Sequence, residues 1–183
     1  VVSLWGFSTE NWKRETYEVF GIMKIFEKYL SSPKIIKELK DEGIRVKHIG
    51  RRDRLSKIRP NLLRIIENLE KITLGNSSRT LFLAIDYGGR DEIVRAMRQL
   101  GKKILEGKLK PGKINENVIS TALDTTGYPD PDFIIRTSGE QRLSGAVPYQ
   151  GTYAEIYFEP VCFPDFTPWR LKKAIENFSK RER

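Results

Sequence analysis

The sequence predicts an α/β fold in which a mainly parallel sheet is flanked by helices. Segments of strand character alternate with segments of helical periodicity along the whole chain, without a repeat, a low-complexity stretch or a change in composition. Residues 81–85 form a continuous apolar run bounded by turn residues, which is typical of a strand buried on both faces. Because such strands usually belong to parallel sheets, we expect a single α/β domain over residues 1–183.

The first elements are expected to be a strand and two helices. Residues 1–7 read as a strand that begins inside the fold, so we expect a further segment upstream of Val1. An amphipathic helix follows, residues 31–33 (Ser-Ser-Pro) interrupt it, and a second helix ends at Gly43. The apolar positions of the first helix fall on one face and are Val19, Ile22, Met23, Phe26, Tyr29 and Leu30.

The rest of the chain continues the alternation. Residues 44–49 alternate between apolar and polar side chains and predict a strand. Pro60 opens a helix that ends near residues 75–76, ahead of the strand at 81–85. The remaining elements expected are a helix over 93–105, a short helix over 114–123, short buried strands at 133–135 and 156–158, and a last helix over 168–178.

The composition limits the classes of protein and of partner. An excess of 33 Lys and Arg over 24 Asp and Glu gives a net charge of +9, which suits a partner that carries phosphate: nucleic acid, an anionic membrane face or a diphosphate substrate. The same charge would also serve solubility alone. No apolar run approaches the roughly 18 residues of a membrane-spanning helix. Cys162 is the only cysteine, which excludes disulfide and zinc frameworks and favours a reduced, cytoplasmic setting.

Two loops that follow predicted strands carry polar chemistry, and in parallel sheets ligands bind beyond the carboxyl ends of the strands. Residues 8–14 (Ser-Thr-Glu-Asn-Trp-Lys-Arg) suit an anionic ligand with an apolar tail; the alternative is a helix cap with Trp12 packed on the core. Residues 86–92 make a glycine turn before a helix, where backbone N–H groups can hold phosphate oxygens. The alternative there is a tight turn whose glycines need positive φ.

The loop after residues 133–135 is the most informative. Arg136 and Arg142 lie in it with several hydroxyls, and arginines at one strand end can hold a diphosphate by charge-assisted, bidentate hydrogen bonds. Downstream, Glu155 is a carboxylate among apolar and aromatic residues, so we expect it to be paired with a cation, bound to a metal ion or shifted in pKa. A structural ion pair between Glu155 and one of these arginines is the alternative.

Together these loops resemble the cis-prenyltransferase family, which includes undecaprenyl and dehydrodolichyl diphosphate synthases. The matching segments occur in the family's order and spacing: Phe7-Ser8-Thr9-Glu10-Asn11-Trp12 with Arg14, Tyr87-Gly88-Gly89-Arg90, residues 132–144, and Tyr153-Ala154-Glu155-Ile156-Tyr157-Phe158. The resemblance implies a parallel sheet flanked by helices and an apolar tunnel for the growing chain, with the helix over 19–30 and the strand at 81–85 as its expected walls. It implies an enzyme that condenses isopentenyl diphosphate onto an allylic diphosphate, such as farnesyl diphosphate, to make a long-chain polyprenyl diphosphate.

The resemblance also implies roles for single residues. The catalytic candidates are Ser8, Asn11 and Trp12, in a mobile loop that orders both substrates. The substrate-binding candidates are Phe7, Trp12, Arg14, Arg136, Arg142 and Ser144, of which the last three would hold the diphosphate of isopentenyl diphosphate. Glu155 matches a carboxylate associated with the magnesium site, so Mg²⁺ is the expected cofactor. A homodimer, a peripheral association with the membrane surface and no nucleic-acid partner are expected.

The family's first motif, Asp-Gly-Asn-Gly-Arg, does not occur in this sequence. In the family it binds the allylic diphosphate and supplies the principal magnesium aspartate, and we expect it upstream of Val1. The alternative function is a non-catalytic partner subunit of a heteromeric cis-prenyltransferase. An RNA-binding domain is disfavoured because no RNP-like or GXXG motif occurs.

Overall fold

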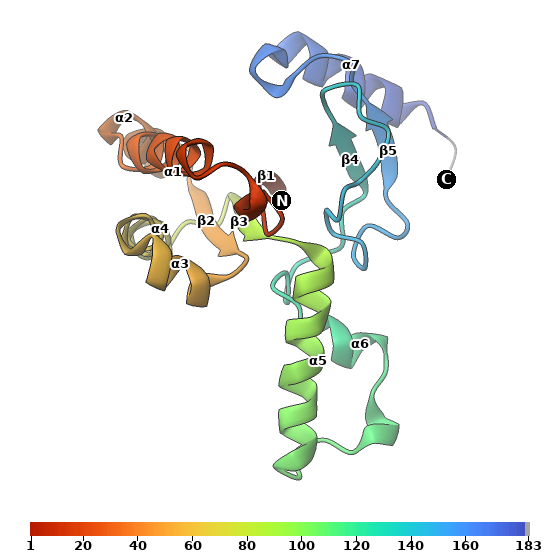
Figure 1. Cartoon of the computed structure of the whole chain (residues 1–183). Helices are drawn as coiled ribbons and strands as arrows, with labels where there is room; N and C mark the ends of the chain where they lie inside the picture. Colours follow the sequence, from red (N-terminus) through yellow and green to blue (C-terminus); the bar gives the residue numbers. More distant parts are fainter. Residues whose placement is uncertain (182–183) are drawn as a thin grey trace. The chain divides into compact units, whose positions relative to one another are not determined.

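The computed structural model describes residues 1–181. Its contacts divide the chain into two compact units, Val1–Tyr128 and the residues from Pro129 onward, and each unit is described by itself. Figure 1 shows the helices and strands of both units. A single domain over residues 1–183 stays a prediction.

The first unit is built on a three-stranded parallel sheet. In sheet order its strands are β1 (Val2–Ser8), β3 (Arg79–Tyr87) and β2 (Ile44–Ile49). Ser8 pairs with Tyr87, and Ile49 pairs with Ala84, so the carboxyl ends of the three strands lie at one edge. Residues 82–87 of β3 are all buried. The predicted parallel pairing and the buried central strand are both confirmed.

Helices pack against this sheet and against one another. The helices of the unit are α1 (Thr16–Leu30), α2 (Pro33–Asp41), α3 (Arg52–Ile58), α4 (Pro60–Ile72), α5 (Gly89–Leu105) and α6 (Glu116–Ser120), with 3₁₀ turns η1 (Asn11–Lys13) and η2 (Pro111–Lys113). α4 contacts α1, α3 and β2. Leu83 and Ile85 of β3 share one apolar core with Met23 of α1 and Ile66 of α4. The helical periodicity of the sequence therefore predicted most of the core-facing sides of α1 and α4. The prediction was wrong at Tyr29, which is 60% exposed because it lies at the margin of the apolar face of α1.

One helix was missed, and several boundaries differ from the sequence expectations, such as the end of α4 at Ile72 rather than near residues 75–76. α3 was not expected; it ends before Arg59, whose backbone is not helical (φ −139°, ψ 61°) because the following Pro60 disfavours the helical conformation. α5 begins at Gly89 rather than at residue 93, since Asp91 and Glu92 suit the positive end of a helix dipole. The short helix expected over 114–123 covers only Glu116–Ser120.

The second unit holds a two-stranded parallel sheet and one long helix. Its elements are β4 (Phe133–Arg136), β5 (Glu155–Phe158), the 3₁₀ turn η3 (Phe163–Asp165) and α7 (Pro168–Ser179). Phe133 of β4 stacks on Phe178 of α7 with 4.5 Å between ring centroids. The thiol of Cys162, between β5 and η3, is exposed. Among residues 1–181 no helix has the length and apolar character needed to cross a membrane.

Candidate active site

The loop after β1 is held by the side chains of two predicted catalytic residues. The amide oxygen of Asn11 accepts a hydrogen bond from the backbone N–H of Ser8 at 2.8 Å, and the Ser8 hydroxyl accepts one from the N–H of Glu10 at 3.1 Å. The N–H of Thr9 donates to the carbonyl of Tyr87 at 3.3 Å. Ser8 and Asn11 therefore fix the shape of this loop at the end of β1, beside the end of β3.

The indole N–H and the aromatic ring of Trp12 each make a contact that holds this side chain. Its indole N–H donates to Oδ1 of Asp86 at 2.8 Å. Its ring meets Phe7 edge to face, with 5.2 Å between centroids. Phe7 is 1% exposed and belongs to the core, whereas Arg14 at the end of the loop is exposed. Of the alternative stated for this loop, the packing of Trp12 on the core is present, whereas no side chain caps η1 or α1.

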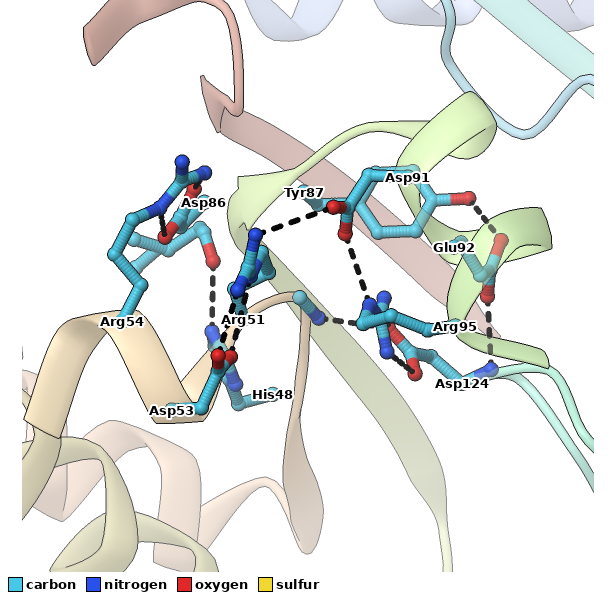
Figure 2. Close-up of polar contacts among 12 residues, drawn as sticks. His48, Arg51, Asp53, Arg54, Asp86, Tyr87, Asp91, Glu92, Arg95 and Asp124 are labelled. Atoms are coloured by element: carbon cyan, nitrogen blue, oxygen red, sulfur yellow. Dashed lines mark hydrogen bonds and ion pairs between the residues drawn. The ribbon is translucent and has the colours of Figure 1, made fainter. Parts of the chain in front are cut away.

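The second loop brings a residue that sequence reasoning passed over. The side chain of Asp86 is 0% exposed, and its carboxylate accepts a hydrogen bond from Nε of Arg54 at 2.7 Å and another from Nη2 of the same guanidinium (Figure 2). The only sequence signal was a carboxylate that directly follows an apolar strand. Its partner Arg54 lies 32 residues earlier, on a helix that was not expected.

The glycines of this loop do not serve positive φ, so that alternative is wrong. The left-handed residue is Asp86, with φ 57°, while Gly88 is extended with φ −152°. A Cβ on Gly88 would lie 2.3 Å from Oγ1 of Thr9. Gly88 is therefore required by the close approach of the first loop. Phosphate binding by residues 86–92 stays a prediction.

Behind the loop, the buried carboxylate of Glu92 and the partly buried one of Asp124 join β3, α5 and the turn after α6 (Figure 2). The Tyr87 hydroxyl donates to Glu92 at 2.6 Å, and burial raises the pKa of that phenol. Glu92 also accepts from the N–H of Asp124 at 2.8 Å. Arg95 donates to both oxygens of Asp124, at 2.8 and 2.7 Å, and this hydrogen bonding raises the pKa of the guanidinium. The N–H of Gly50 donates to Asp124 as well, at 2.9 Å.

A polar cavity of about 310 Å³ lies beside these groups. Its lining residues are His48, Gly50, Arg51, Arg52, Asp53, Arg95 and Asp124. Arg51 donates to Asp53 at 2.7 Å, Arg52 pairs with Glu70, and Arg95 pairs with Asp124. Because its guanidinium groups already face carboxylates, this cavity is not our candidate for a diphosphate site.

The loop after β4 carries the predicted arginine cluster in an unusual backbone. Ser138 and Ser144 have φ of 71° and 51°, and Gly139 and Gly145 are left-handed too. The N–H groups of Ser138 and Gly139 donate to the carbonyls of Val161 and Glu159, at 2.7 and 3.0 Å, which ties the loop to the segment after β5. Non-glycine residues in this conformation cost free energy and are often found at functional sites.

The two arginines of this loop differ in environment. Arg136 is half-buried at the carboxyl end of β4, and its Nε is buried without a hydrogen-bond partner among the described residues. Arg142 is exposed and pairs with Glu140 at 2.6 Å. Ser144 is exposed. A buried guanidinium N–H without a partner is costly, so Arg136 is suited to receive an anion.

Glu155 lies at the other end of the small sheet. It pairs in register with Phe133, whereas Arg136 pairs with Phe158, so about 10 Å of strand separates the two positions. Glu155 forms an ion pair with Arg181, which also donates to the carbonyl of Ile156 at 3.1 Å. The alternative of an ion pair between Glu155 and Arg136 or Arg142 is therefore wrong, because the partner of Glu155 is Arg181, an arginine that sequence reasoning did not consider.

The described residues do not by themselves fit a magnesium site. Over residues 1–181 no group of three His, Cys, Asp or Glu side chains is placed to hold a metal ion. Glu155 offers one carboxylate, which is already paired with the guanidinium of Arg181. Magnesium in proteins usually takes one or two carboxylates together with substrate phosphates and water.

The predicted site residues fall into two groups. Phe7, Ser8, Asn11, Trp12 and Arg14 lie in the first unit, at the carboxyl edge of its sheet. Arg136, Arg142, Ser144 and Glu155 lie in the second unit. Sequence reasoning missed the residues that hold these groups in place, Arg54, Asp86 and Arg181, because each acts through a partner distant in sequence.

Comparisons with known proteins agree with this arrangement of elements. A prenyltransferase family model described as "Putative undecaprenyl diphosphate synthase" matches residues 1–183. An isoprenyl transferase of Rhizobium meliloti is 40% identical over 182 residues, which are 100% of this chain and 72% of that protein. An isoprenyl transferase of Aquifex aeolicus is 42% identical over 182 residues, which cover 100% of this chain and 74% of that protein.

Two solved structures are similar over nearly the whole chain. Lavandulyl diphosphate synthase from Lavandula x intermedia, in complex with dimethylallyl diphosphate, superposes with a TM-score of 0.93 at 35% identity, covering 99% of this chain and 76% of that one. A probable undecaprenyl diphosphate synthase from Campylobacter jejuni superposes with a TM-score of 0.83 at 34% identity, covering 99% and 80%.

Proposed function

Since the chain belongs to the undecaprenyl diphosphate synthase family of prenyltransferases, we propose that it condenses isopentenyl diphosphate with an allylic diphosphate to make a long-chain polyprenyl diphosphate. The class of enzyme is that of its relatives: the chain is a cis-prenyltransferase. The observation that carries the proposed site is Arg136, a strand-end arginine whose buried Nε lacks a hydrogen-bond partner in the described part of the chain.

In the proposed site, the loop after β4 holds the diphosphate of isopentenyl diphosphate. A phosphate oxygen would supply the acceptor that Nε of Arg136 lacks. The pair between Arg142 and Glu140 is exposed, and exposed pairs contribute little stability, so Arg142 is available to turn toward a diphosphate. Ser144 would add a hydroxyl from the same loop.

The loop after β1 has a complementary role in the proposal. Ser8 and Asn11 hold the loop backbone, Trp12 offers an apolar ring, and Arg14 offers an exposed cation. Phe7 supports the Trp12 ring from the core. A loop with these groups can contact the apolar part and the diphosphate of a prenyl substrate at the same time.

The proposed reaction depends mainly on charge and position. The C–O bond of the allylic diphosphate breaks, the double-bond electrons of isopentenyl diphosphate form the new C–C bond, and a proton leaves the isopentenyl unit. Arg136 and Arg142 would hold the nucleophile in register, and fixed cations need little reorganisation as charge develops. We assign no side chain as the base, because the departing diphosphate can accept the proton.

We propose Mg²⁺ as the cofactor from the family, with Glu155 as an associated carboxylate. When bound, magnesium would stabilise the departing diphosphate. The described residues do not form a complete magnesium site, so the steps above involve only this chain's own groups. Chelation of divalent cations is expected to abolish turnover, and full activity in excess chelator would overturn this assignment.

Several further features belong to the same proposal. α1 keeps Phe20, Ile25 and Tyr29 exposed, which supports a wall of an apolar tunnel on that helix. We propose that the protein acts as a homodimer in the cytoplasm or at the membrane surface, with no nucleic-acid partner. The alternative of a non-catalytic partner subunit is favoured by no observation, since the relatives are themselves isoprenyl transferases.

The test of the proposed function uses the native-length protein with magnesium, farnesyl diphosphate and labelled isopentenyl diphosphate. The expected product is an elongated cis-polyprenyl diphosphate. If no product forms until a cognate second subunit is added, the partner-subunit alternative replaces the proposal.

Replacement of Arg136 tests the site itself. Arg136→Ala removes the charge-assisted hydrogen bonds to the diphosphate, and we expect kcat/KM for isopentenyl diphosphate to fall about 100-fold. Arg98→Ala is the matched control, because Arg98 is an exposed arginine on α5 outside the site. If Arg136→Ala keeps the wild-type kcat/KM for isopentenyl diphosphate, as Arg98→Ala should, Arg136 is excluded from substrate binding.

A further inference from the structure

The carboxylate of Asp86 joins the two loops at the edge of the first unit's sheet. It follows the apolar run of β3 and accepts the indole N–H of Trp12. It is also paired with Arg54 of α3 (Figure 2). We propose that Asp86, held by Arg54, is a positioning residue that fixes the orientation of Trp12 and with it the loop over residues 8–14. The importance of this for catalysis rests on the proposed function; the structural part does not.

The hydrogen bonds of this cluster leave little freedom to the Trp12 ring. An indole has a single N–H donor, and that of Trp12 reaches Oδ1 of Asp86 at 2.8 Å. The guanidinium of Arg54 lies 5.4 Å from the Trp12 ring centroid, within the range of a cation–π contact. Phe7 meets the same ring edge to face. Rotation of Trp12 would break these three contacts together.

Burial makes Arg54 necessary to this arrangement. The Asp86 side chain is 0% exposed, while that of Arg54 is 24% exposed. An ionised carboxylate withdrawn from water needs a cation and hydrogen-bond donors, and Arg54 supplies both through Nε and Nη2. Without Arg54 the buried carboxylate would lose its cation and two hydrogen-bond donors, so Asp86 would no longer be fixed as the acceptor for the indole N–H of Trp12.

The backbone of Asp86 is fixed by the same segment that carries Arg54. The carbonyl of Asp86 accepts the N–H of Arg51 at 3.0 Å, and Gly50 packs directly against this carbonyl. The left-handed φ of 57° is tolerated better by Asp and Asn than by most residues. The turn between β2 and α3 therefore holds both the main chain and the side chain of Asp86.

The functional consequence follows from the place of Trp12 in the sequence. Its neighbour Asn11 holds the backbone of Ser8, so a displaced Trp12 would disturb the whole loop. This loop is proposed to order the two diphosphate substrates and to take no direct part in the chemical step. Loss of the Asp86–Arg54 pair should therefore raise KM for these substrates more than it lowers kcat.

The test reads the Trp12 indole directly. The chain has Trp5, Trp12 and Trp169, so a ¹H–¹⁵N spectrum contains three indole signals, which single Trp→Phe variants assign. Arg54→Met and Asp86→Asn are expected to shift or broaden the Trp12 signal. Asn keeps the left-handed backbone accessible and one acceptor oxygen, so D86N provides a second variant if R54M folds poorly. The Trp5 indole donates to the carbonyl of Tyr87 and should not move.

Arg52→Met is the matched control. Arg52 lies on the same helix, and its guanidinium forms an ion pair with Glu70 rather than with Asp86. R52M should keep the Trp12 signal and the wild-type kinetics, whereas R54M and D86N should raise KM about tenfold in the native-length protein. An unchanged Trp12 signal in both R54M and D86N would overturn the proposal. A shifted signal in these variants, together with a wild-type protein that lacks prenyltransferase activity, would instead overturn the proposed function and leave the positioning role supported.

Discussion

At the scale of single residues, the non-glycine residues with a left-handed backbone lie at a strand end or in the loop that follows a strand. The four non-glycine residues with positive φ in the described chain are Asp86, Ser138, Ser144 and Val147. One lies at the end of the buried strand β3 and three lie in the loop after β4. Such conformations persist only where neighbouring contacts determine them, as hydrogen bonds to Val161 and Glu159 do for the β4 loop.

His48 gives a prediction about pH. Burial lowers the pKa of His48, although a hydrogen bond between its Nε2 and the carbonyl of Ile85 at 2.8 Å opposes the shift. In the unfolded chain His48 therefore binds a proton near pH 6.5, whereas in the folded chain it binds this proton only at a lower pH. The contribution of neutral His48 to the free energy of unfolding is fully present above about pH 6.5. It is lost as the pH falls below this value, by up to about 1.4 kcal/mol per pH unit.

Urea denaturation between about pH 5.5 and 7 measures this dependence. His48→Gln should remove most of the slope, because glutamine does not titrate. If the wild type and H48Q show the same slope, groups other than His48 determine the dependence.

The sequence predicted the roles of some single residues and missed those of others. The arginines after β4 were found because two cations and several hydroxyls stand together in sequence. Asp86 as a partner of Trp12, and Arg181 as the partner of Glu155, were not found, because those pairs span 74 and 26 residues. Local pattern carries no information on such pairings; they depend on how the strands are ordered.

At the scale of elements, the junction of β2 with β3 has no space for a side chain. Gly50 has φ 126°, and a Cβ there would lie 2.4 Å from the carbonyl oxygen of Ile85 and 2.8 Å from that of Asp86. Both the conformation and the contact exclude other residues. This junction directly precedes α3, so it sets the position of that helix and of the pair between Arg54 and Asp86.

Gly50→Ala is therefore expected to destabilise the first unit by at least about 2 kcal/mol. Gly101→Ala is the counterpart: Gly101 lies inside α5, and an alanine methyl there would meet open space within 4 Å among the described residues, so alanine should stabilise the helix by about 0.5–1 kcal/mol. Thermal or urea unfolding compares the two. Equal stability of G50A and the wild type would show that the junction can relax.

The elements themselves were largely predictable from sequence. Alternation found β2, a continuous apolar run found β3, and helical periodicity found most of the apolar faces of α1 and α4, because these faces are long and fill one core. α3 was missed because it has seven residues and one buried apolar side chain, Leu55, which is too little for a helical period. The start of α5 was placed late because its first turn is polar.

At the scale of the whole molecule, the net charge of +9 predicts a dependence on salt. A positive protein attracts diphosphate substrates over distances comparable to the Debye length, about 10 Å at 0.1 M ionic strength. We expect kcat/KM for isopentenyl diphosphate to fall severalfold between about 20 and 300 mM salt, with kcat at saturation nearly constant. A flat kcat/KM over this range would mean that local contacts alone attract the substrate.

The thiol of Cys162 offers a single site for attaching a spin label. It is exposed, it is the only sulfhydryl in the sequence, and it directly follows Val161, whose carbonyl anchors the arginine loop. A nitroxide can therefore be attached at one defined point without replacing any native residue. In a solution of polypeptides that each carry one spin, dipolar coupling arises only between different copies, so pulsed electron resonance would act as a ruler for the proposed homodimer.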